Sequence, residues 1–390
     1  MRGGREFDIV VYGASGFTGR LVAEYLAGRK GAATRWAMAG RDFAKLAAVR
    51  DEIGAPSDLP LIAADASNPQ SLRGMAKRTR VVLTTVGPYQ LYGSDLVAAC
   101  AAEGTDYADL CGEPAWMRAM IDANDAKAKK TGARIVFSCG FDSIPFDLGV
   151  LTLQTEATKR FGKPFARVKG RVRKMRGTFS GGTAASLKAT LAAAAKDPNI
   201  VALLKNPFAL TPGFEGPKQP SGMKPEFDDD FGSWMAPFVM AAINTRNVHR
   251  TNALTGFSFG RDFVYDEMVM TGAGEKGEQI AKGMATQGSG MEGDKGPKPG
   301  EGPSREEREN GFYDLVFLGV GADGRKLAAS VKGDKDPGYG STSKMIAETA
   351  LALTADDTVA GGVWTPGAAL GLPLAERLQK SAGIVFAIEG

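Results

Sequence analysis

Apolar residues in the first 150 positions of the chain fall into short runs, separated by longer stretches where they recur every three or four residues. The runs are rich in β-branched and aromatic residues and predict strands at 8–12, 36–39, 61–64, 81–85, 107–109 and 135–138. The stretches between them predict helices at 18–27, 43–53, 71–77, 94–103 and 115–130. Apolar strands that alternate with helices are typical of a parallel sheet covered on both faces. We therefore predict an α/β fold with a Rossmann-type, doubly wound parallel sheet in residues 1–150.

The pattern changes after residue 150. Basic and apolar residues alternate over 167–175, as they do in a strand with one exposed face. Further strands are predicted at 257–271, 312–320 and 326–332, and an alanine-rich helix at 183–195. These elements indicate a second, mostly antiparallel α+β domain over residues 151–340, for substrate binding or dimerisation.

Two later segments are rich in residues that interrupt regular structure. Residues 272–310 contain much Gly, Lys, Glu and Pro, and we interpret most of them as a mobile insertion with a short helix at 278–284. A helical period returns at 341–353. The uncharged stretch 358–375 approaches membrane-spanning length, but Gly and Pro interrupt it repeatedly, which predicts an ordered loop and no transmembrane segment.

The bulk composition narrows the range of functions. The chain has 390 residues, 43% of them hydrophobic and 24% charged, which is the balance of a globular protein with at least two domains. Its net charge of +4 is small for this length, and it has no basic stripe with interleaved aromatic residues, so we predict no nucleic-acid partner. Three cysteines argue against a disulfide framework, and the polar N-terminus shows no signal peptide, so we predict a cytoplasmic protein. A single histidine leaves no histidine-based metal cluster, and we predict no metal site.

The most informative segment is the glycine-rich turn after the first predicted strand. Gly13 permits a tight turn, Gly16 lets a diphosphate approach the backbone, and Gly19 lets the next helix pack closely on the strand. The free N–H groups of the helix N-terminus favour phosphate at this point. The alternative is an ordinary turn in an unrelated α/β domain. The residues predicted to bind a dinucleotide are Gly13, Ser15, Gly16, Phe17, Thr18 and Gly19.

The end of the second strand indicates which dinucleotide is bound. Enzymes that use NAD usually place an Asp or Glu there to hold the ribose 2′-hydroxyl, whereas this strand ends in Gly40 and Arg41. Arg41 is placed to pair with a 2′-phosphate, so NADP (as NADPH) is favoured, the alternative being a solvated loop arginine. Asp65 ends the third strand, where it either reaches the adenine edge or serves as the N-terminal carboxylate of the next helix.

The loop after the fourth strand is expected beside the nicotinamide riboside, because ligands of doubly wound sheets bind beyond the carboxyl ends of the strands. Thr85, Val86 and Gly87 are therefore predicted to contact the cofactor. Tyr89 is a catalytic candidate that would donate a proton or a hydrogen bond to a substrate carbonyl. Packing of its ring on the cofactor is the alternative.

Three further residues are candidates for the substrate side. Asp142 follows the sixth strand, either in the active-site wall, where we predict a catalytic role, or at a capped junction between domains. Arg246 and Arg250 are four residues apart and share one face of a predicted helix. They are candidates for binding an anionic group of the substrate, and a solvated helix face is the alternative.

Six segments in order along the chain resemble the saccharopine dehydrogenase-like oxidoreductases, a family that includes the trans-acting enoyl reductases of lipid biosynthesis. These segments are 13–20, 85–93, 107–113, 139–147, 236–240 and 361–366. The resemblance covers nearly the whole chain, is more specific in the N-terminal half, and leaves 272–310 unmatched. It implies a Rossmann domain that binds a nicotinamide cofactor, an inserted substrate domain, and a C-terminal segment, 341–390, that returns to the first domain.

In the enoyl-reductase branch, the resemblance implies hydride transfer from NADPH to the β-carbon of an α,β-unsaturated acyl thioester. The thioester oxygen then needs a donor as enolate charge develops, for which Tyr89 and backbone groups near 139–143 are candidates. Two alternatives stay open. One is a saccharopine-type amino- or imino-acid dehydrogenase with Arg246 and Arg250 as carboxylate binders. The other is a non-catalytic dinucleotide-binding protein that senses redox state or associates with lipid. A homodimer is compatible with each of them.

Overall fold

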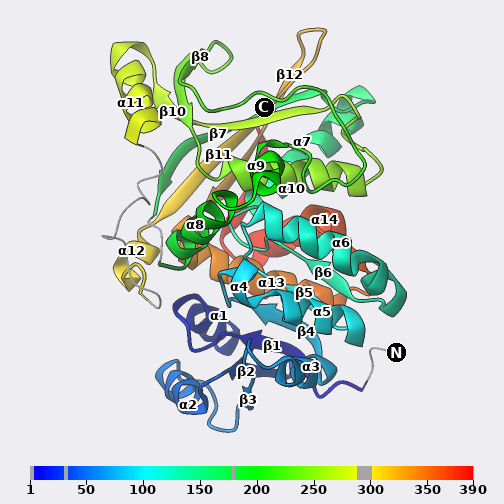
Figure 1. Ribbon diagram of the computed structural model, residues 1–390. Helices are drawn as coiled ribbons and strands as arrows, with labels where there is room; N and C mark the ends of the chain where they lie inside the picture. The colour runs from blue at the N-terminus through cyan, green and yellow to red at the C-terminus, as the bar shows by residue number, and fades with distance from the viewer. Residues whose placement is uncertain (1–3, 30–33, 178–180, 288–300, 390) are drawn as a thin grey trace.

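The computed structural model describes residues 4–29, 34–177, 181–287 and 301–389, which form two seven-stranded sheets (Figure 1). The first sheet contains β1 (Phe7–Tyr12), β2 (Trp36–Gly40), β3 (Leu61–Ala63), β4 (Thr79–Thr84), β5 (Asp106–Ala108), β6 (Arg134–Val136) and β13 (Gly362–Trp364). Their order is β13-β6-β5-β4-β1-β2-β3, and all neighbouring strands are parallel. The predicted Rossmann-type parallel sheet is therefore confirmed.

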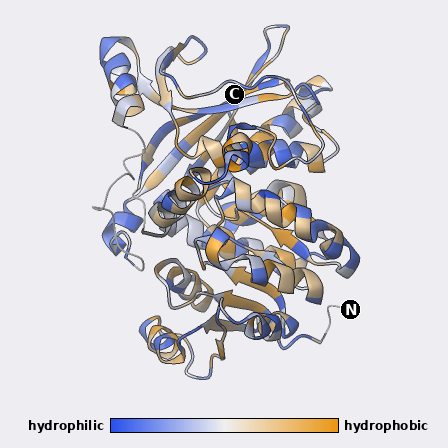
Figure 2. Cartoon of the chain, in the orientation of Figure 1, coloured by the Kyte–Doolittle hydropathy of each residue, from blue (hydrophilic) through white to orange (hydrophobic). Residues whose placement is uncertain are grey.

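Helices cover both faces of the first sheet because its strands are apolar on both sides (Figure 2). In β1, Ile9 and Val11 belong to one hydrophobic core, whereas Val10 and Tyr12 belong to the other. The first core includes residues of α1 (Phe17–Ala27), α2 (Phe43–Glu52) and α13 (Thr342–Ala355). The second includes residues of α3 (Pro69–Lys77), α5 (Ser94–Glu103) and α6 (Pro114–Thr131).

The second sheet lies above the first in Figure 1 and is mixed. It contains β7 (Arg167–Arg176), β8 (Glu226–Asp228), β9 (Ser233–Pro237), β10 (Val264–Gly272), β11 (Phe312–Val320), β12 (Lys326–Gly333) and β14 (Ile384–Glu389). Their order is β14-β12-β11-β7-β10-β9-β8, and every neighbouring pair is antiparallel except β7 with β10. This confirms the mostly antiparallel α+β architecture. The strand predicted at 257–271 begins only at Val264, because Phe257 and Gly260 have φ angles of 62° and 94° and form turns.

The C-terminal part of the chain contributes to both sheets. Strand β13 pairs with β6 in the first sheet, and β14 pairs with β12 in the second. Between them, α14 (Pro366–Ser381) packs on α7 (Ile144–Phe161) and on α13. The stretch 358–375, predicted as a loop, therefore holds β13 and the first half of α14, whose helix is interrupted at Gly371. The division of the chain at residues 150 and 340 stays a prediction.

The remaining helical elements are α4 (Tyr89–Tyr92), α8 (Gly181–Ala194), α9 (Pro198–Lys205), α10 (Ala241–Leu254), α11 (Gly274–Gln287), α12 (Arg305–Glu309) and a π-helical turn, η1 (Pro337–Ser341). Residues 288–300 of the predicted mobile insertion lie outside the described residues. Helix α11 is longer than the short helix predicted at 278–284. No helix in the described ranges combines the length and apolar character that a bilayer crossing requires.

Candidate functional site

The glycine-rich turn between β1 and α1 is closely packed. Gly13 has a φ of 89°, and a β-carbon added to it would lie 2.7 Å from Cγ2 of Val86. A β-carbon on Gly19 would overlap the carbonyl oxygen of Gly13 and lie 2.9 Å from the Cα of Ala14. Gly16 is the N-cap of α1. Among the described residues no side chain accepts a hydrogen bond from the first N–H groups of this helix. The turn thus leaves a helix N-terminus open to a diphosphate, as the glycine spacing predicts.

The end of β2 lies next to this turn. Arg41 follows the last residue of the strand and is exposed. The hydroxyl of Ser15 lies 3.6 Å from a β-carbon added to Gly40, so Ser15 and Arg41 flank the same strand end. This arrangement fits a 2′-phosphate subsite, and the assignment of Arg41 to it stays a prediction.

Asp65 does not cap the helix that follows it, because Asn68 accepts the first N–H groups of α3. Its Oδ1 instead accepts from the backbone N–H and the hydroxyl of Ser67, at 2.8 Å each. These hydrogen bonds and the nearby charge of Arg41 hold the pKa of Asp65 below its usual value. Of the two interpretations of Asp65, the helix carboxylate is wrong, and the contact with adenine stays a prediction.

A pocket of about 480 Å³ begins beside this turn. Thr18, Thr85 and Gly87 line its cofactor side. The rest of its lining is mainly apolar and includes Leu110, Met175, Leu191, Leu204, Val239, Met240 and Ile243. The pocket therefore connects the predicted nicotinamide position with an apolar chamber large enough for a small ligand.

Tyr89 lines the pocket, and its hydroxyl already donates one hydrogen bond and accepts another. The hydroxyl donates to the carbonyl of Thr84 at 3.3 Å and accepts from the N–H of Leu110 at 3.0 Å. Burial raises the pKa of Tyr89 well above its ordinary value, and nearby carboxyl and thiol groups add to the effect. These contacts give Tyr89 a role in holding the loop, and its role as a proton donor stays a prediction.

Glu113 holds the same loop and was not found by sequence reasoning. Its buried carboxylate accepts from the backbone N–H groups of Tyr89 and Gln90, at 2.9 and 2.8 Å. It also accepts from the hydroxyl of Ser186 in α8, at 2.8 Å. Glu113 therefore connects the segment that follows β4 with α8, and both contribute residues to the pocket lining.

Asp142 lies in the pocket wall, where the sequence placed it. Its Oδ1 is buried and has no hydrogen-bond partner among the described residues. Burial raises the pKa of Asp142 to about 7. The neighbouring residues are fixed, since the N–H of Phe141 donates to Thr342 at 2.9 Å and the hydroxyl of Ser143 accepts from Asn247 at 2.9 Å. A carboxyl group in this setting is partly protonated near neutral pH, and the catalytic role of Asp142 stays a prediction.

The two arginines of α10 have different surroundings. Arg246 lines the pocket, and its guanidinium donates to the carbonyls of Ala242 and Leu204. Burial lowers the pKa of Arg246 to about 10. Arg250 is buried and donates to the carbonyls of Leu210 and Val363. It is not among the described residues that line the pocket, so its contacts support a structural role and not the predicted contact with substrate.

The chain is similar in sequence to known proteins over nearly its whole length. Residues 9–136 match the family model of the saccharopine dehydrogenase NADP binding domain. A trans-acting enoyl reductase of Mycobacterium tuberculosis H37Rv is 40% identical, with 98% of this chain and 97% of that protein covered. A trans-acting enoyl reductase of Mycobacterium ulcerans Agy99 is 39% identical, with 98% of each chain covered.

Among solved structures, apo saccharopine dehydrogenase (L-Glu forming) from Saccharomyces cerevisiae has the same fold. The TM-score is 0.57 at 12% identity, with 98% of this chain and 99% of that chain covered. The domain match confirms NADP as the cofactor. The individual residues that hold it stay predictions.

Proposed function

The chain belongs to the saccharopine dehydrogenase-like oxidoreductases, in the branch of the trans-acting enoyl reductases, and we propose that it uses NADPH to reduce the carbon–carbon double bond of an α,β-unsaturated acyl thioester. The observation that carries this proposal is one pocket. It is lined by Thr18 of the dinucleotide turn, by a set of apolar side chains and by Asp142. Oδ1 of Asp142 has no hydrogen-bond partner among the described residues. An acyl chain needs the apolar wall, and protonation of a carbon centre needs an acid beside the cofactor.

NADPH, when bound, supplies the hydride that adds to the β-carbon of the substrate. The turn at Gly13 and the helix N-terminus at Gly16 would hold its diphosphate, and Arg41 would pair with its 2′-phosphate. Thr85, Val86 and Gly87 would border the nicotinamide end, since they continue from β4 beside the turn.

The residues of the pocket complete the reaction. Arg246 is a cation in the wall that forms no ion pair with the described residues, and we assign it the stabilisation of the thioester oxygen as negative charge develops there. Asp142 donates its proton to the α-carbon. The new C–H bond forms as the carboxyl O–H breaks, and a carboxylate remains. Tyr89 and Glu113 stabilise the conformation of the segment that follows β4.

Turnover of NADPH with crotonyl-CoA and with a longer trans-2-enoyl-CoA tests this proposal. We expect both to be reduced, with a lower KM for the longer chain because more of it contacts the apolar wall. The Asp142→Asn variant should keep its affinity for NADPH and lose about a hundredfold or more in kcat, the usual size of a general-acid effect. The exposed Asp229 provides the matched control, Asp229→Asn, with kcat unchanged.

Other outcomes of the same assay point to the other functions. Oxidation of saccharopine without reduction of enoyl thioesters would indicate an amino-acid dehydrogenase. Tight binding of NADPH with no turnover of either substrate class would indicate a non-catalytic sensor. The homodimer and the cytoplasmic location stay predictions.

A further inference from the structure

The pocket reaches the surface of the protein between three apolar side chains. Leu191, Met175 and Val239 line the pocket, yet Leu191 is 54% exposed and the other two are 38% exposed each. Phe141 and Ile243 line the same pocket and are buried, so contact with the pocket does not by itself give such exposure. Leu191, Met175 and Val239 therefore lie where the pocket meets solvent, and together they form an apolar opening.

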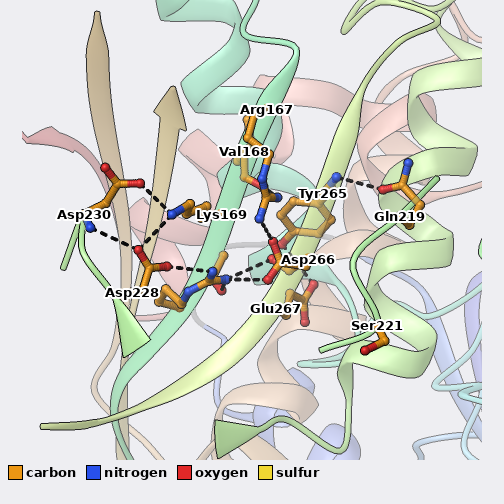
Figure 3. A network of polar contacts seen from close by, with 12 residues as sticks. Arg167, Val168, Lys169, Gln219, Ser221, Asp228, Asp230, Tyr265, Asp266 and Glu267 are labelled. Carbon is orange, nitrogen blue, oxygen red and sulfur yellow. Dashed lines mark hydrogen bonds and ion pairs between the residues drawn. The ribbon is translucent and has the colours of Figure 1, made fainter. Parts of the chain in front are cut away.

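Separate elements supply the side chains of the apolar opening. Leu191 belongs to α8, Met175 lies near the end of β7, and Val239 precedes α10. Strand β7 is central in the second sheet and is held there by ion pairs, such as that of Lys169 with Asp228 at 2.8 Å (Figure 3). One side of the opening is therefore part of a stable sheet.

Helix α8 forms another side of the opening and is held in place by two hydrogen bonds. The hydroxyl of Ser186 donates to Glu113 at 2.8 Å. The side-chain amide of Gln90 donates to the hydroxyl of Thr190 at 3.2 Å. Ser186 and Thr190 are four residues apart and so lie on one side of the helix. Because Leu191 directly follows Thr190, these contacts also fix the position of Leu191 at the opening.

The charged groups of the pocket lie away from its apolar opening. Within the described ranges, the charged residues that line the pocket are Glu113, Asp142 and Arg246. Glu113, Arg246 and Oδ1 of Asp142 are buried, so they belong to the interior of the pocket. A polar carrier group would lose hydration between Leu, Met and Val side chains, whereas the methylene groups of an alkyl chain are stabilised there. The opening therefore suits the alkyl end of an acyl substrate.

The size of the pocket gives a second reason for this orientation. Its volume of about 480 Å³ lies in the lower part of the range of roughly 300–1,000 Å³ that is usual for small-molecule sites. The nicotinamide ring and the enoyl thioester group would share this volume, which leaves little room for a long alkyl chain. A long chain therefore fits if it continues through the opening to the surface.

We propose that Leu191 is a specificity-determining residue whose side chain leaves the apolar opening wide enough for an alkyl chain to pass. This inference rests on the proposed function and adds a substrate class, acyl thioesters whose chain is longer than the pocket. The chain runs from the thioester group beside Asp142 and Arg246, past Leu191, to the surface. The volume of the pocket then does not limit the length of the chain.

Reduction of crotonyl-CoA and of trans-2-dodecenoyl-CoA by wild type and by Leu191→Trp tests the proposal. The wild type should reduce both, with the higher kcat/KM for the longer substrate. The larger side chain of Leu191→Trp should block the opening and lower kcat/KM for the dodecenoyl substrate about tenfold to a hundredfold, the usual size of a misfit in a hydrophobic pocket. For crotonyl-CoA, kcat/KM should stay near the wild-type value, because the short chain ends inside the pocket.

Two further variants separate a blocked opening from a general effect of the substitution. Leu191→Ala keeps the opening free and should reduce both substrates as the wild type does. Ile280→Trp places the same large side chain at an exposed position of α11, outside the described lining of the pocket, and should leave the ratio of the two kcat/KM values unchanged. The NADPH affinity and the midpoint of urea unfolding should match the wild type in all three variants.

Equal losses of Leu191→Trp with both substrates, or no loss with either, would overturn the proposal. Calorimetry with butyryl-CoA and dodecanoyl-CoA measures binding without turnover and so keeps this proposal apart from the proposed function. If the wild type binds dodecanoyl-CoA more tightly than Leu191→Trp does but reduces no enoyl thioester, the proposed function fails and the opening for the alkyl chain is supported. If both proteins bind dodecanoyl-CoA equally, the role of Leu191 is wrong.

Discussion

Replacement of Gly19 by alanine tests the dinucleotide turn most locally. The added β-carbon would overlap the carbonyl oxygen of Gly13 and lie 2.7 Å from its carbonyl carbon and 2.9 Å from the Cα of Ala14. These are backbone atoms of the turn, so they cannot rotate away as the end of a flexible side chain would. Helix α1 and the turn must therefore separate for the substitution to fit.

The expected cost follows from the size of this overlap. Forcing one extra methyl group into a closely packed site usually costs about 1–3 kcal/mol. Because the turn and the start of α1 form the diphosphate site, we expect part of this cost to appear as weaker NADPH binding. A loss of about 1.4–2.8 kcal/mol corresponds to an affinity lowered about tenfold to a hundredfold. The midpoint of urea unfolding should also fall.

Fluorescence titration with NADPH and urea unfolding measure the two effects. Gly74 provides the matched control, because it lies within helix α3 and a β-carbon added to it would have no atom within 4 Å. Gly74→Ala should bind NADPH as the wild type does and be more stable by about 0.5–1 kcal/mol. Unchanged NADPH affinity in Gly19→Ala would refute the assignment of the turn to the diphosphate.

Three other predictions follow from charged residues. Arg41→Ala should weaken NADPH binding about tenfold to a hundredfold and leave NADH binding unchanged, which titration with both cofactors measures. Arg171→Met removes the cation that Asp228 and Asp266 share but leaves Lys169 paired with Asp228 and Arg167 paired with Asp266, and should lower the free energy of unfolding in urea by about 1–3 kcal/mol. Burial raises the pKa of Glu267, on β10, to about 8, which favours the folded wild type below about pH 4.5, and this contribution is lost as the pH rises to about 8. Glu267→Gln removes that dependence, so unfolding curves across this range should shift in favour of the variant, by at most about 5 kcal/mol. A constant difference between the two proteins would contradict the assigned titration.

The first sheet and its dinucleotide turn could be predicted from the sequence because their signals are local. Apolar runs give the strands, and Gly13, Gly16 and Gly19 lie within one strand–turn–helix unit. The turn at Phe257 was missed because a positive φ is rare in a residue with a side chain, so no pattern announces it. The error at 358–375 has another cause. Strand β13 has only three residues, which is too short for a clear pattern. Helix α14 is interrupted at Gly371, so glycine and proline residues that usually terminate a helix lie within this one.

The pocket was less predictable because its walls come from distant parts of the chain. Glu113 meets Tyr89 only through the fold, and Thr342 reaches Phe141 from 201 residues away. The spacing of Arg246 and Arg250 correctly predicted that both lie on one helix. It could not show which carbonyl groups would accept hydrogen bonds from each guanidinium group. Burial, which sets the pKa of Asp142, depends on the whole fold in the same way.

The most direct test of the account is the fate of the hydride. The protein would be supplied with NADPH that carries deuterium at both hydrogens of the nicotinamide C4 and with crotonyl-CoA in ordinary water, and the butyryl product analysed by mass spectrometry and NMR. We predict one deuterium at the β-carbon and one solvent hydrogen at the α-carbon. Product without deuterium, or cofactor bound away from the Gly13 turn in a complex of the protein with NADPH, would contradict it.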